Sequence, residues 1–157
     1  MSLGLYLHIP YCFSKCRYCD FYSAPGQRGV PRAYVDALLR ELSRFAPDAP
    51  LRPDTLYFGG GTPSLLDPAD AARLIDAAQP LPGAEITLEA NPETVTEDSL
   101  RAFREAGVNR ISFGVQSARD SQLKTLGRPH TAKQARAAFA ASRRAGFENL
   151  SGDIMLA

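Results

Sequence analysis

The sequence predicts an α/β protein built on one curled parallel β-sheet. Five short apolar segments alternate with longer segments in which apolar residues recur at helical spacing. Such alternation joins each strand to the next through a helical crossover, which is the connection that parallel strands require. Polar residues also follow several of the expected strands, at the carboxyl ends where α/β folds bind ligands. These two observations together predict both the fold class and the edge of the sheet that carries a site.

The first strand is expected over residues 3–9, an apolar segment that Pro10 ends. A helix should begin near Pro31, because proline is tolerated at the first helical position. Five apolar residues of this helix lie three or four positions apart and predict a face that packs on the sheet: Val35, Leu38, Leu39, Leu42 and Phe45.

The second strand, over residues 55–58, leads into three consecutive glycines, Gly59 to Gly61. Glycines adopt positive φ angles and let the backbone pass very close to a ligand. A tight turn between strand and helix would explain part of this pattern, and the run matches neither the Walker A nor the dinucleotide fingerprint. The next helix is expected to begin at Asp67 as N-cap and Pro68 as first residue.

The remaining elements continue the alternation. Strands are expected over residues 85–90, 109–115 and 149–156. The helices between them should run from Thr96 to Gly107, over residues 119–126, and from Thr131 to Gly146, since threonine caps helix starts and glycine helix ends.

Composition and charge exclude several classes of protein. The chain has 157 residues, 45% of them hydrophobic and 22% charged, which suits one globular domain with a core. A net charge of +1 gives no electrostatic footprint for nucleic acid or for an anionic membrane. No apolar run reaches about 18 residues, and the N-terminal residues lack signal-peptide features. We therefore expect a cytoplasmic protein whose cysteines stay reduced.

All three cysteines, Cys12, Cys16 and Cys19, lie within eight residues in the spacing CxxxCxxC. Thiolates are the usual ligands of iron–sulfur clusters, and three of them can hold a [4Fe-4S] cluster while one iron stays open. The amino and carboxylate groups of S-adenosylmethionine (SAM) could chelate that iron. Reductive cleavage of SAM is among the radical chemistries that cofactors supply.

Three other interpretations of the cysteines stay open at this point. Zinc could be bound with His8 as a fourth ligand, although His8 lies in an expected strand and not in a short knuckle. The cysteines could be inert core residues, although Lys15 and Arg17 between them make a poor core pattern. A disulfide framework would leave one cysteine over.

The segment from Tyr6 to Phe21 resembles the signature of the radical SAM superfamily. Its flanking residues resemble one branch of that superfamily, which holds the oxygen-independent coproporphyrinogen III dehydrogenases and the HemW-like heme chaperones. The dehydrogenases carry a fourth cysteine two positions after the third. Here that position is Phe21, which favours the HemW-like side. The similarity continues over residues 59–64, 88–93, 112–117 and 127–131.

The resemblance implies a partial (β/α) radical SAM barrel in which Cys12, Cys16 and Cys19 hold the [4Fe-4S] cluster. It also implies that nine residues contact SAM: Tyr6, Tyr18, Gly60, Gly61, Thr62, Glu89, Gln116, Arg128 and Asp153. These residue types suit the task, because carboxylates accept from ammonium and ribose hydroxyl groups and arginine offers a cationic fork. His8 is included as a supporting residue, whereas His130 is expected to be a loop residue without a role in the site.

The function implied by the resemblance is heme binding and delivery by a HemW-like chaperone. The alternative is the oxidative decarboxylation of coproporphyrinogen III, and a structural zinc module is a remote third hypothesis. Implied partners are SAM, heme or a porphyrinogen, and an electron donor such as flavodoxin or ferredoxin. The family barrel has six strands, so we expect residues 1–157 to be the N-terminal part of the radical SAM core, truncated after the fifth strand. The sixth βα unit and a C-terminal domain would be absent.

Overall fold

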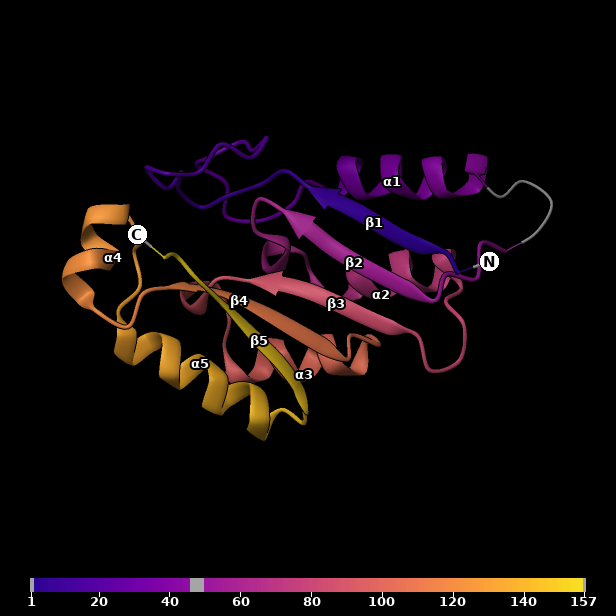
Figure 1. Ribbon diagram of the computed structural model, residues 1–157. Coiled ribbons are helices and arrows are strands. Elements are labelled where there is room, and N and C mark those ends of the chain that lie inside the picture. The colour runs from indigo at the N-terminus through magenta and orange to yellow at the C-terminus, as the bar shows by residue number, and fades with distance from the viewer. Residues whose placement is uncertain (1, 46–49, 157) are drawn as a thin grey trace.

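Five parallel strands form one sheet in the computed structural model, which describes residues 2–45 and 50–156. The strand order follows the chain, so that each strand pairs with the next one in sequence. The bounds are β1 Gly4–Ile9, β2 Thr55–Gly60, β3 Glu85–Ala90, β4 Arg110–Gln116 and β5 Asn149–Ile154. Within the described residues the sheet stays open, with β1 at one edge and β5 at the other (Figure 1). The predicted fold class is confirmed.

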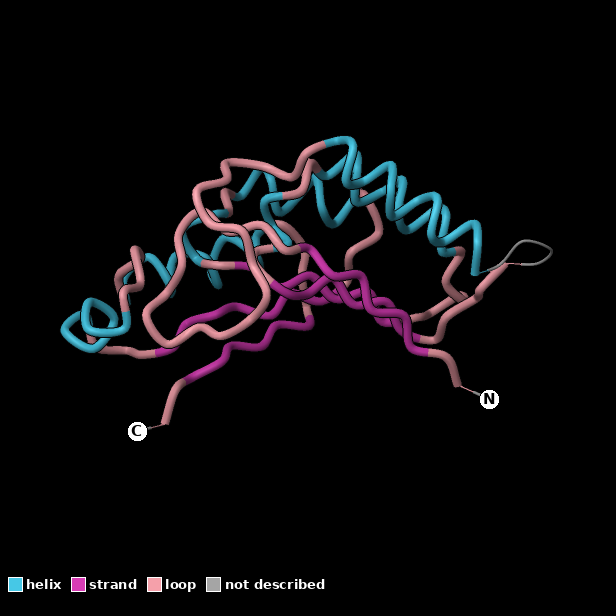
Figure 2. Tube along the Cα trace, turned by 90° about the horizontal axis from the view of Figure 1, so that it is seen from above, coloured by secondary structure: helices cyan, strands magenta, loops and turns pink. Residues whose placement is uncertain are grey.

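The helices lie together on one side of the curved sheet (Figure 2). They are α1 Arg32–Phe45, α2 Pro68–Ala78, α3 Glu97–Glu105, α4 Asp120–Leu126 and α5 Ala132–Arg144. Two single 3₁₀ turns, η1 Pro63–Leu65 and η2 Pro92–Thr94, follow β2 and β3 directly. Each connection from strand to strand therefore passes over the same face, as right-handed crossovers do.

The predicted helix caps are present. Asp67 accepts a hydrogen bond from the backbone N–H of Ala69 at the start of α2. Thr96 and Thr131 each form a capping box, at the starts of α3 and α5. In both boxes the cap hydroxyl accepts from the third helical N–H, and the side-chain oxygen of that third residue, Ser99 or Gln134, accepts from the cap N–H.

Two local predictions were wrong, and β5 ends at Ile154, two residues before the predicted end of that strand. Phe45 was expected on the packing face of α1, but it is 76% exposed at the last position of the helix. The glycines after residue 58 were expected to leave the strand. Instead, Gly59 and Gly60 belong to β2 and pair with His8 and Ile9 of β1.

The two faces of the sheet differ in chemistry. Alternate strand residues point toward the helices and form the buried core, as the period of two requires: Leu7, Ile9, Leu56, Phe58, Ile86, Leu88, Ile111 and Phe113. The other face is mainly polar, although parallel sheets are normally apolar on both faces: Tyr6, His8, Tyr57, Thr87, Glu89, Arg110, Ser112, Ser151 and Asp153. Among the described residues no helix covers this polar face (Figure 2).

A search for membrane-crossing segments in the described part of the chain finds no helix with the necessary length and apolar character.

Candidate functional site

A single cavity at the carboxyl ends of the strands brings together most of the predicted site residues. The segment between β1 and α1, which we call the cysteine loop (residues 10–31), lies beside the ends of β1 and β2 (Figure 1). Eleven of the thirteen predicted residues line the cavity between this loop and the sheet: Cys12, Cys16, Cys19, Tyr18, Gly60, Gly61, Thr62, Glu89, Gln116, Arg128 and Asp153. They come from all five strand ends, so the parallel topology is what assembles them.

Backbone hydrogen bonds hold the cysteine loop in place. The N–H of Cys12 donates to the carbonyl of Ala24 at 3.0 Å, and its own carbonyl accepts from Gln27 at 3.0 Å. The loop is also joined to the rest of the protein, because Thr62 N–H donates to the Tyr11 carbonyl at 2.8 Å. The cysteines thus lie on a segment that folds back on itself and is fastened to the end of β2.

The three cysteines are free thiols that differ in burial. Cys12 is 7% exposed, whereas Cys16 and Cys19 are half-buried. Among residues 2–45 and 50–156, no three side chains of His, Cys, Asp or Glu gather in the way that a single metal ion requires. A [4Fe-4S] cluster takes each thiolate on a different iron, so its ligands need only face a shared space. All three cysteines line the cavity and meet that condition.

The three glycines at the end of β2 let this strand approach its neighbours closely. A Cβ atom on Gly61 would lie 2.7 Å from the carbonyl oxygen of Tyr11 and 2.9 Å from Sγ of Cys12. Gly60 has a φ of +119°, and a Cβ there would lie 2.6 Å from the His8 ring. The glycine run was predicted to let the backbone pass close to another group. In the structure, the groups that it approaches are the cysteine loop and β1.

Glu89 lines the cavity, and two hydrogen-bond donors from β2 fix its carboxylate. The Tyr57 hydroxyl donates to one carboxylate oxygen at 2.9 Å, and Gly60 N–H donates to the other at 3.0 Å. Burial of the phenol, together with its hydrogen bond to Glu89, raises the pKa of Tyr57 far above the usual value. The phenol therefore remains a donor, and the carboxylate keeps a fixed orientation.

Arg128 crosses the cavity from the segment between α4 and α5. Its Nη1 donates to Sγ of Cys16 at 3.3 Å, while Nη2 donates to Oδ1 of Asn91 at 2.6 Å and to the Gly114 carbonyl at 2.7 Å. The guanidinium group thus links the ends of β3 and β4 to the cysteine loop, and it places a positive charge beside a thiol.

Tyr18, which lies between Cys16 and Cys19 in the sequence, lines the same cavity. Burial raises the pKa of Tyr18 to about 12, and the neighbouring Cys16 and Cys19 add to this rise against the opposite effect of Arg128. The phenol is neutral at physiological pH and can offer its ring and its hydroxyl to a ligand.

Gln116 and Asp153 lie at the ends of β4 and β5. Gln116 has a φ of 65° at a β-bulge, and its carbonyl accepts from Met155 N–H at 3.0 Å. This bulge re-aims the end of the strand. Both side chains line the cavity and supply an amide and a carboxylate at its rim.

Tyr6 and His8 were also predicted for the site, but neither lines the cavity. Tyr6 is 54% exposed and stacks on Tyr57, with ring centroids 5.9 Å apart. The His8 ring lies between the Tyr6 hydroxyl, 3.4 Å from Nδ1, and the Tyr22 carbonyl, 3.1 Å from Nε2. His8 therefore connects β1 to the cysteine loop. Burial raises the pKa of Tyr6, with a smaller contribution from Glu89.

Sequence reasoning missed Asn91, which lines the cavity beside Glu89. Its Nδ2 donates to the Thr62 hydroxyl at 3.1 Å, and its Oδ1 accepts from Arg128. The sequence did contain a signal for Asn91, because this polar residue directly follows β3. Gln116 had been selected by the same criterion, a polar residue at the end of an expected strand. Ser112 and Gly114 of β4 line the cavity as well.

His130 lies in a loop, as expected, but it is not a free loop residue. It is 2% exposed, with Nδ1 3.1 Å from Oε2 of Glu93 and Nε2 3.1 Å from the Val115 carbonyl. Both partners follow or end strands, so the imidazole ties the segment after β3 to the end of β4. No periodic pattern marks such a residue in the sequence.

Comparison with known proteins gives a family match over nearly the whole chain. The model of the radical SAM superfamily matches residues 6–157. The heme chaperone HemW of Escherichia coli (strain K12) is 43% identical over 98% of this chain and 42% of its own length. HemW of Bacillus subtilis (strain 168) is 37% identical over 96% of this chain and 41% of its length.

A mitochondrial protein of Bos taurus, radical S-adenosyl methionine domain-containing protein 1, is 40% identical over 98% of this chain and 36% of its own length. Among solved structures, the coproporphyrinogen III oxidase HemN from Escherichia coli, described as a radical SAM enzyme, aligns with a TM-score of 0.86 at 31% identity. That alignment covers 98% of this chain and 37% of HemN. The chain thus spans about two fifths of the length of these relatives.

Proposed function

The chain belongs to the radical SAM superfamily, and on that premise we propose that Cys12, Cys16 and Cys19 hold a [4Fe-4S] cluster with SAM bound beside it. The observation that supports this most directly is that all three free thiols line one cavity together with a strand-end carboxylate and a glycine-rich backbone. When bound, the cluster would supply the electron for reductive cleavage of SAM.

The chain's own residues would hold and orient SAM. Glu89, fixed by Tyr57 and Gly60, offers a carboxylate to an ammonium or a ribose hydroxyl group. Asp153 and Gln116 offer a second carboxylate and an amide at the rim of the cavity. The remaining proposed contacts within the cavity are made by backbone, ring, hydroxyl and cationic groups: Gly60, Gly61, Thr62, Tyr18 and Arg128. Tyr6, which stacks on Tyr57 outside the cavity, is a further proposed contact. His8 supports the cysteine loop through its bond to the Tyr22 carbonyl.

For the biological role we propose heme binding and delivery, as in the HemW chaperones. The support is twofold. Relatives named heme chaperone HemW are 37% and 43% identical to this chain, and Phe21 occupies the position of the fourth cysteine of the dehydrogenases. Phe21 is 69% exposed and lines the cavity, so an apolar side chain stands at its opening. We further propose a cytoplasmic location and an electron donor such as flavodoxin or ferredoxin.

The second candidate is oxygen-independent coproporphyrinogen III oxidation. The structural likeness to HemN, at a TM-score of 0.86, favours it. The substrate would be decarboxylated oxidatively at its propionate side chains, which requires SAM cleavage in every turnover. The chaperone proposal requires no such chemistry.

The first experiment tests the cofactors. The protein is reconstituted anaerobically with iron and sulfide, reduced, and examined by electron paramagnetic resonance with and without SAM. We expect about four irons per chain and a reduced-cluster signal that shifts when SAM is added. The control replaces Cys12, Cys16 and Cys19 by alanine and should hold no cluster. No cluster in the unaltered protein, or a signal indifferent to SAM, would overturn the cofactor proposal.

A second experiment separates the two roles. The reconstituted protein is titrated with heme and then mixed with an apo-heme protein, and heme transfer is followed by absorbance. In parallel, coproporphyrinogen III, SAM and a reductant are supplied anaerobically. Heme uptake and transfer without porphyrinogen conversion supports the chaperone proposal. Protoporphyrinogen formation would contradict it and establish the alternative.

A further inference from the structure

Two of the three cysteine sulfurs accept hydrogen bonds from side chains outside the cysteine loop. The hydroxyl of Thr62 lies 3.6 Å from Sγ of Cys12 and donates to it. Nη1 of Arg128 donates to Sγ of Cys16 at 3.3 Å. Thr62 follows β2 and Arg128 follows α4, so separate parts of the chain contact each sulfur.

Asn91 connects these two donors. Its Nδ2 donates to the Thr62 hydroxyl at 3.1 Å, and its Oδ1 accepts from Nη2 of Arg128 at 2.6 Å. One side-chain amide therefore orients the hydroxyl group that faces Cys12 and the guanidinium group that faces Cys16. Because Asn91 directly follows β3, the sheet determines the position of both donors.

The guanidinium of Arg128 has little freedom to move. Besides Asn91, Nη2 contacts the Gly114 carbonyl at 2.7 Å, and Nε is buried without a hydrogen-bond partner among the described residues. The preceding turn is fixed as well, since the Leu126 carbonyl accepts from Arg17 N–H of the cysteine loop at 3.1 Å. Arg128 and the loop that carries Cys16 are thus held against each other by two independent bonds.

We propose that Arg128, clamped by Asn91, is a positioning residue for the iron–sulfur cluster, and that its hydrogen bond to Cys16 favours the reduced state of the cluster. This inference rests on the proposed function, which places a cluster on Cys16. Reduction adds one electron, taken from a chemical titrant such as dithionite, and makes or breaks no bond. The added negative charge spreads onto the thiolate sulfurs, where a cationic donor stabilises it.

This role does not require SAM. Both terminal nitrogens of Arg128 already have partners on the chain. The effect on the cluster is therefore measurable in the absence of SAM, where a loss of SAM contacts cannot contribute.

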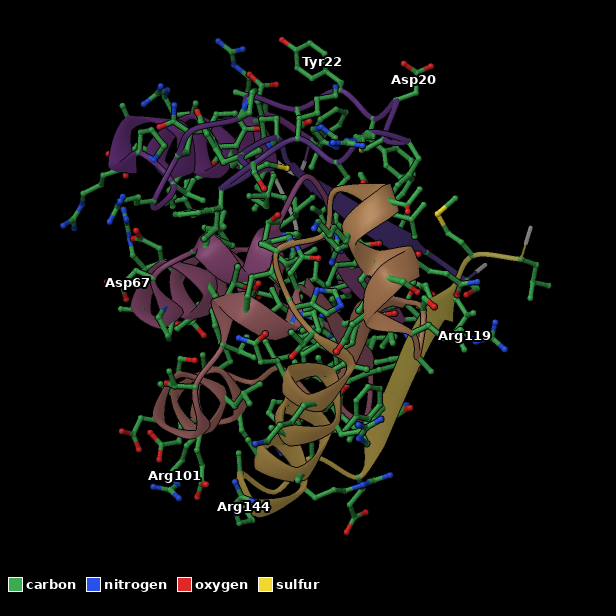
Figure 3. The ribbon with its side chains drawn as sticks, turned by 90° about the vertical axis from the view of Figure 1, so that its left-hand side faces the viewer. Asp20, Tyr22, Asp67, Arg101, Arg119 and Arg144 are labelled. Atoms are coloured by element: carbon green, nitrogen blue, oxygen red, sulfur yellow. The ribbon has the colours of Figure 1, made fainter. Side chains whose placement is uncertain are left out.

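The test compares the ratio of reduced to oxidised cluster in variants, without SAM, at the solution potential where the unaltered protein is half reduced. Arg128→Met removes the charge and the donor, and we expect the ratio to fall about tenfold, which corresponds to 59 mV for a one-electron couple. Arg128→Lys keeps the positive charge, and its ratio of reduced to oxidised cluster should fall clearly less. The matched control is Arg119→Met. It removes a positive charge from the exposed start of α4, where Arg119 points away from the protein (Figure 3).

Iron and sulfide contents are measured first, so that only variants with a complete cluster are compared. If Arg128→Met assembles no cluster, Asn91→Ala takes its place. It keeps the charge but removes one of the two bonds that hold Nη2 of Arg128, and the ratio of reduced to oxidised cluster should fall at least threefold. A fall of less than threefold would overturn the inference. So would an equal fall in Arg119→Met, or a fall in Arg128→Lys as large as in Arg128→Met.

The two proposals fail in different ways. If the unaltered protein assembles no four-iron cluster, the proposed function fails and this inference fails with it. If the unaltered protein assembles the cluster and responds to SAM while the Arg128 variants keep the same ratio, only the inference about Arg128 is refuted.

Discussion

The hydroxyl of Tyr57 on β2 donates a 2.9 Å hydrogen bond to the carboxylate of Glu89 on the adjacent strand β3. The second carboxylate oxygen accepts from Gly60 N–H at 3.0 Å. Glu89 is thus oriented from two directions on the polar face of the sheet, and the bond from Tyr57 is the one that a substitution can remove.

Tyr57→Phe should weaken SAM binding without preventing cluster assembly. A hydrogen bond to a charged group contributes about 1.5–3 kcal/mol, of which we expect about 1 kcal/mol to appear as lost affinity, because Gly60 still holds the carboxylate. The dissociation constant for SAM should rise about fivefold, as measured by isothermal titration calorimetry on the reconstituted protein. Unchanged affinity at full iron content would show that Glu89 does not need this donor.

Gly61→Ala should disrupt the cysteine loop. The new Cβ would lie 2.7 Å from the Tyr11 carbonyl oxygen and 2.9 Å from Sγ of Cys12, so backbone must move. Overpacking of this kind costs about 1–3 kcal/mol, and the iron content after reconstitution should fall to less than half. The control is Gly29→Ala, in which the new Cβ would lie 3.9 Å from the Leu65 carbonyl oxygen, an ordinary van der Waals distance. Normal iron content in Gly61→Ala would contradict the expected crowding.

His130→Ala should destabilise the fold more than a loop substitution does. It removes both bonds of the buried imidazole and leaves Glu93 and the Val115 carbonyl without this partner. Unsatisfied buried groups cost about 1–3 kcal/mol each, so we expect the free energy of unfolding in urea to fall by about 2–4 kcal/mol. A loss below about 0.5 kcal/mol, the range of ordinary surface substitutions, would show that the bonds of His130 are dispensable.

The ion pair between Glu97 and Arg144 should make stability depend on acidic pH. Arg144, 2.7 Å from Glu97, lowers the pKa of that carboxyl below its usual value, and Arg101 adds a smaller effect. Figure 3 shows Arg101 of α3 and Arg144, the last residue of α5, on the same part of the surface. Because the folded pKa is the lower one, the stabilisation is present above the usual glutamate pKa and is lost as pH falls through the folded value.

The measurement is the thermal midpoint of Glu97→Gln and of the unaltered protein between pH 7 and pH 3. The two midpoints should differ at pH 7 and converge as the pH approaches 3. A difference that stays constant over this range would show that the ion pair does not contribute. High salt should also reduce the difference, since the Arg144 side chain is exposed and the Glu97 side chain is partly exposed.

Much of the fold was predictable because its signals are local. Helical periodicity, cap residues and strand-ending prolines act over a few positions, and they predicted the number and order of the strands and α-helices, although not the 3₁₀ turns η1 and η2. Errors arose where a neighbouring strand decided the outcome. Gly59 and Gly60 extend β2 because β1 offers them partners, and a run of glycines carries no sign of that.

The candidate site was predictable in part for the same reason. Residues at the carboxyl ends of strands share one edge of a parallel sheet, so Glu89, Gln116 and Asp153 could be expected to meet. The resemblance to the radical SAM superfamily and its HemW-like branch, first suggested by the cysteine stretch, is confirmed by the family match and the HemW relatives.

The sequence by itself determined the order of elements, the caps and the three clustered thiols, since each depends on residues close together in the chain. Only the tertiary structure decided what surrounds those thiols. Arg128 lies 112 positions from Cys16, yet it donates directly to that sulfur, and the end of β3 brings Asn91 beside the same guanidinium. Contacts of this kind depend on how strands align side by side and on which side chains remain buried with a partner. Neither property can be predicted from the residue spacing of a short segment.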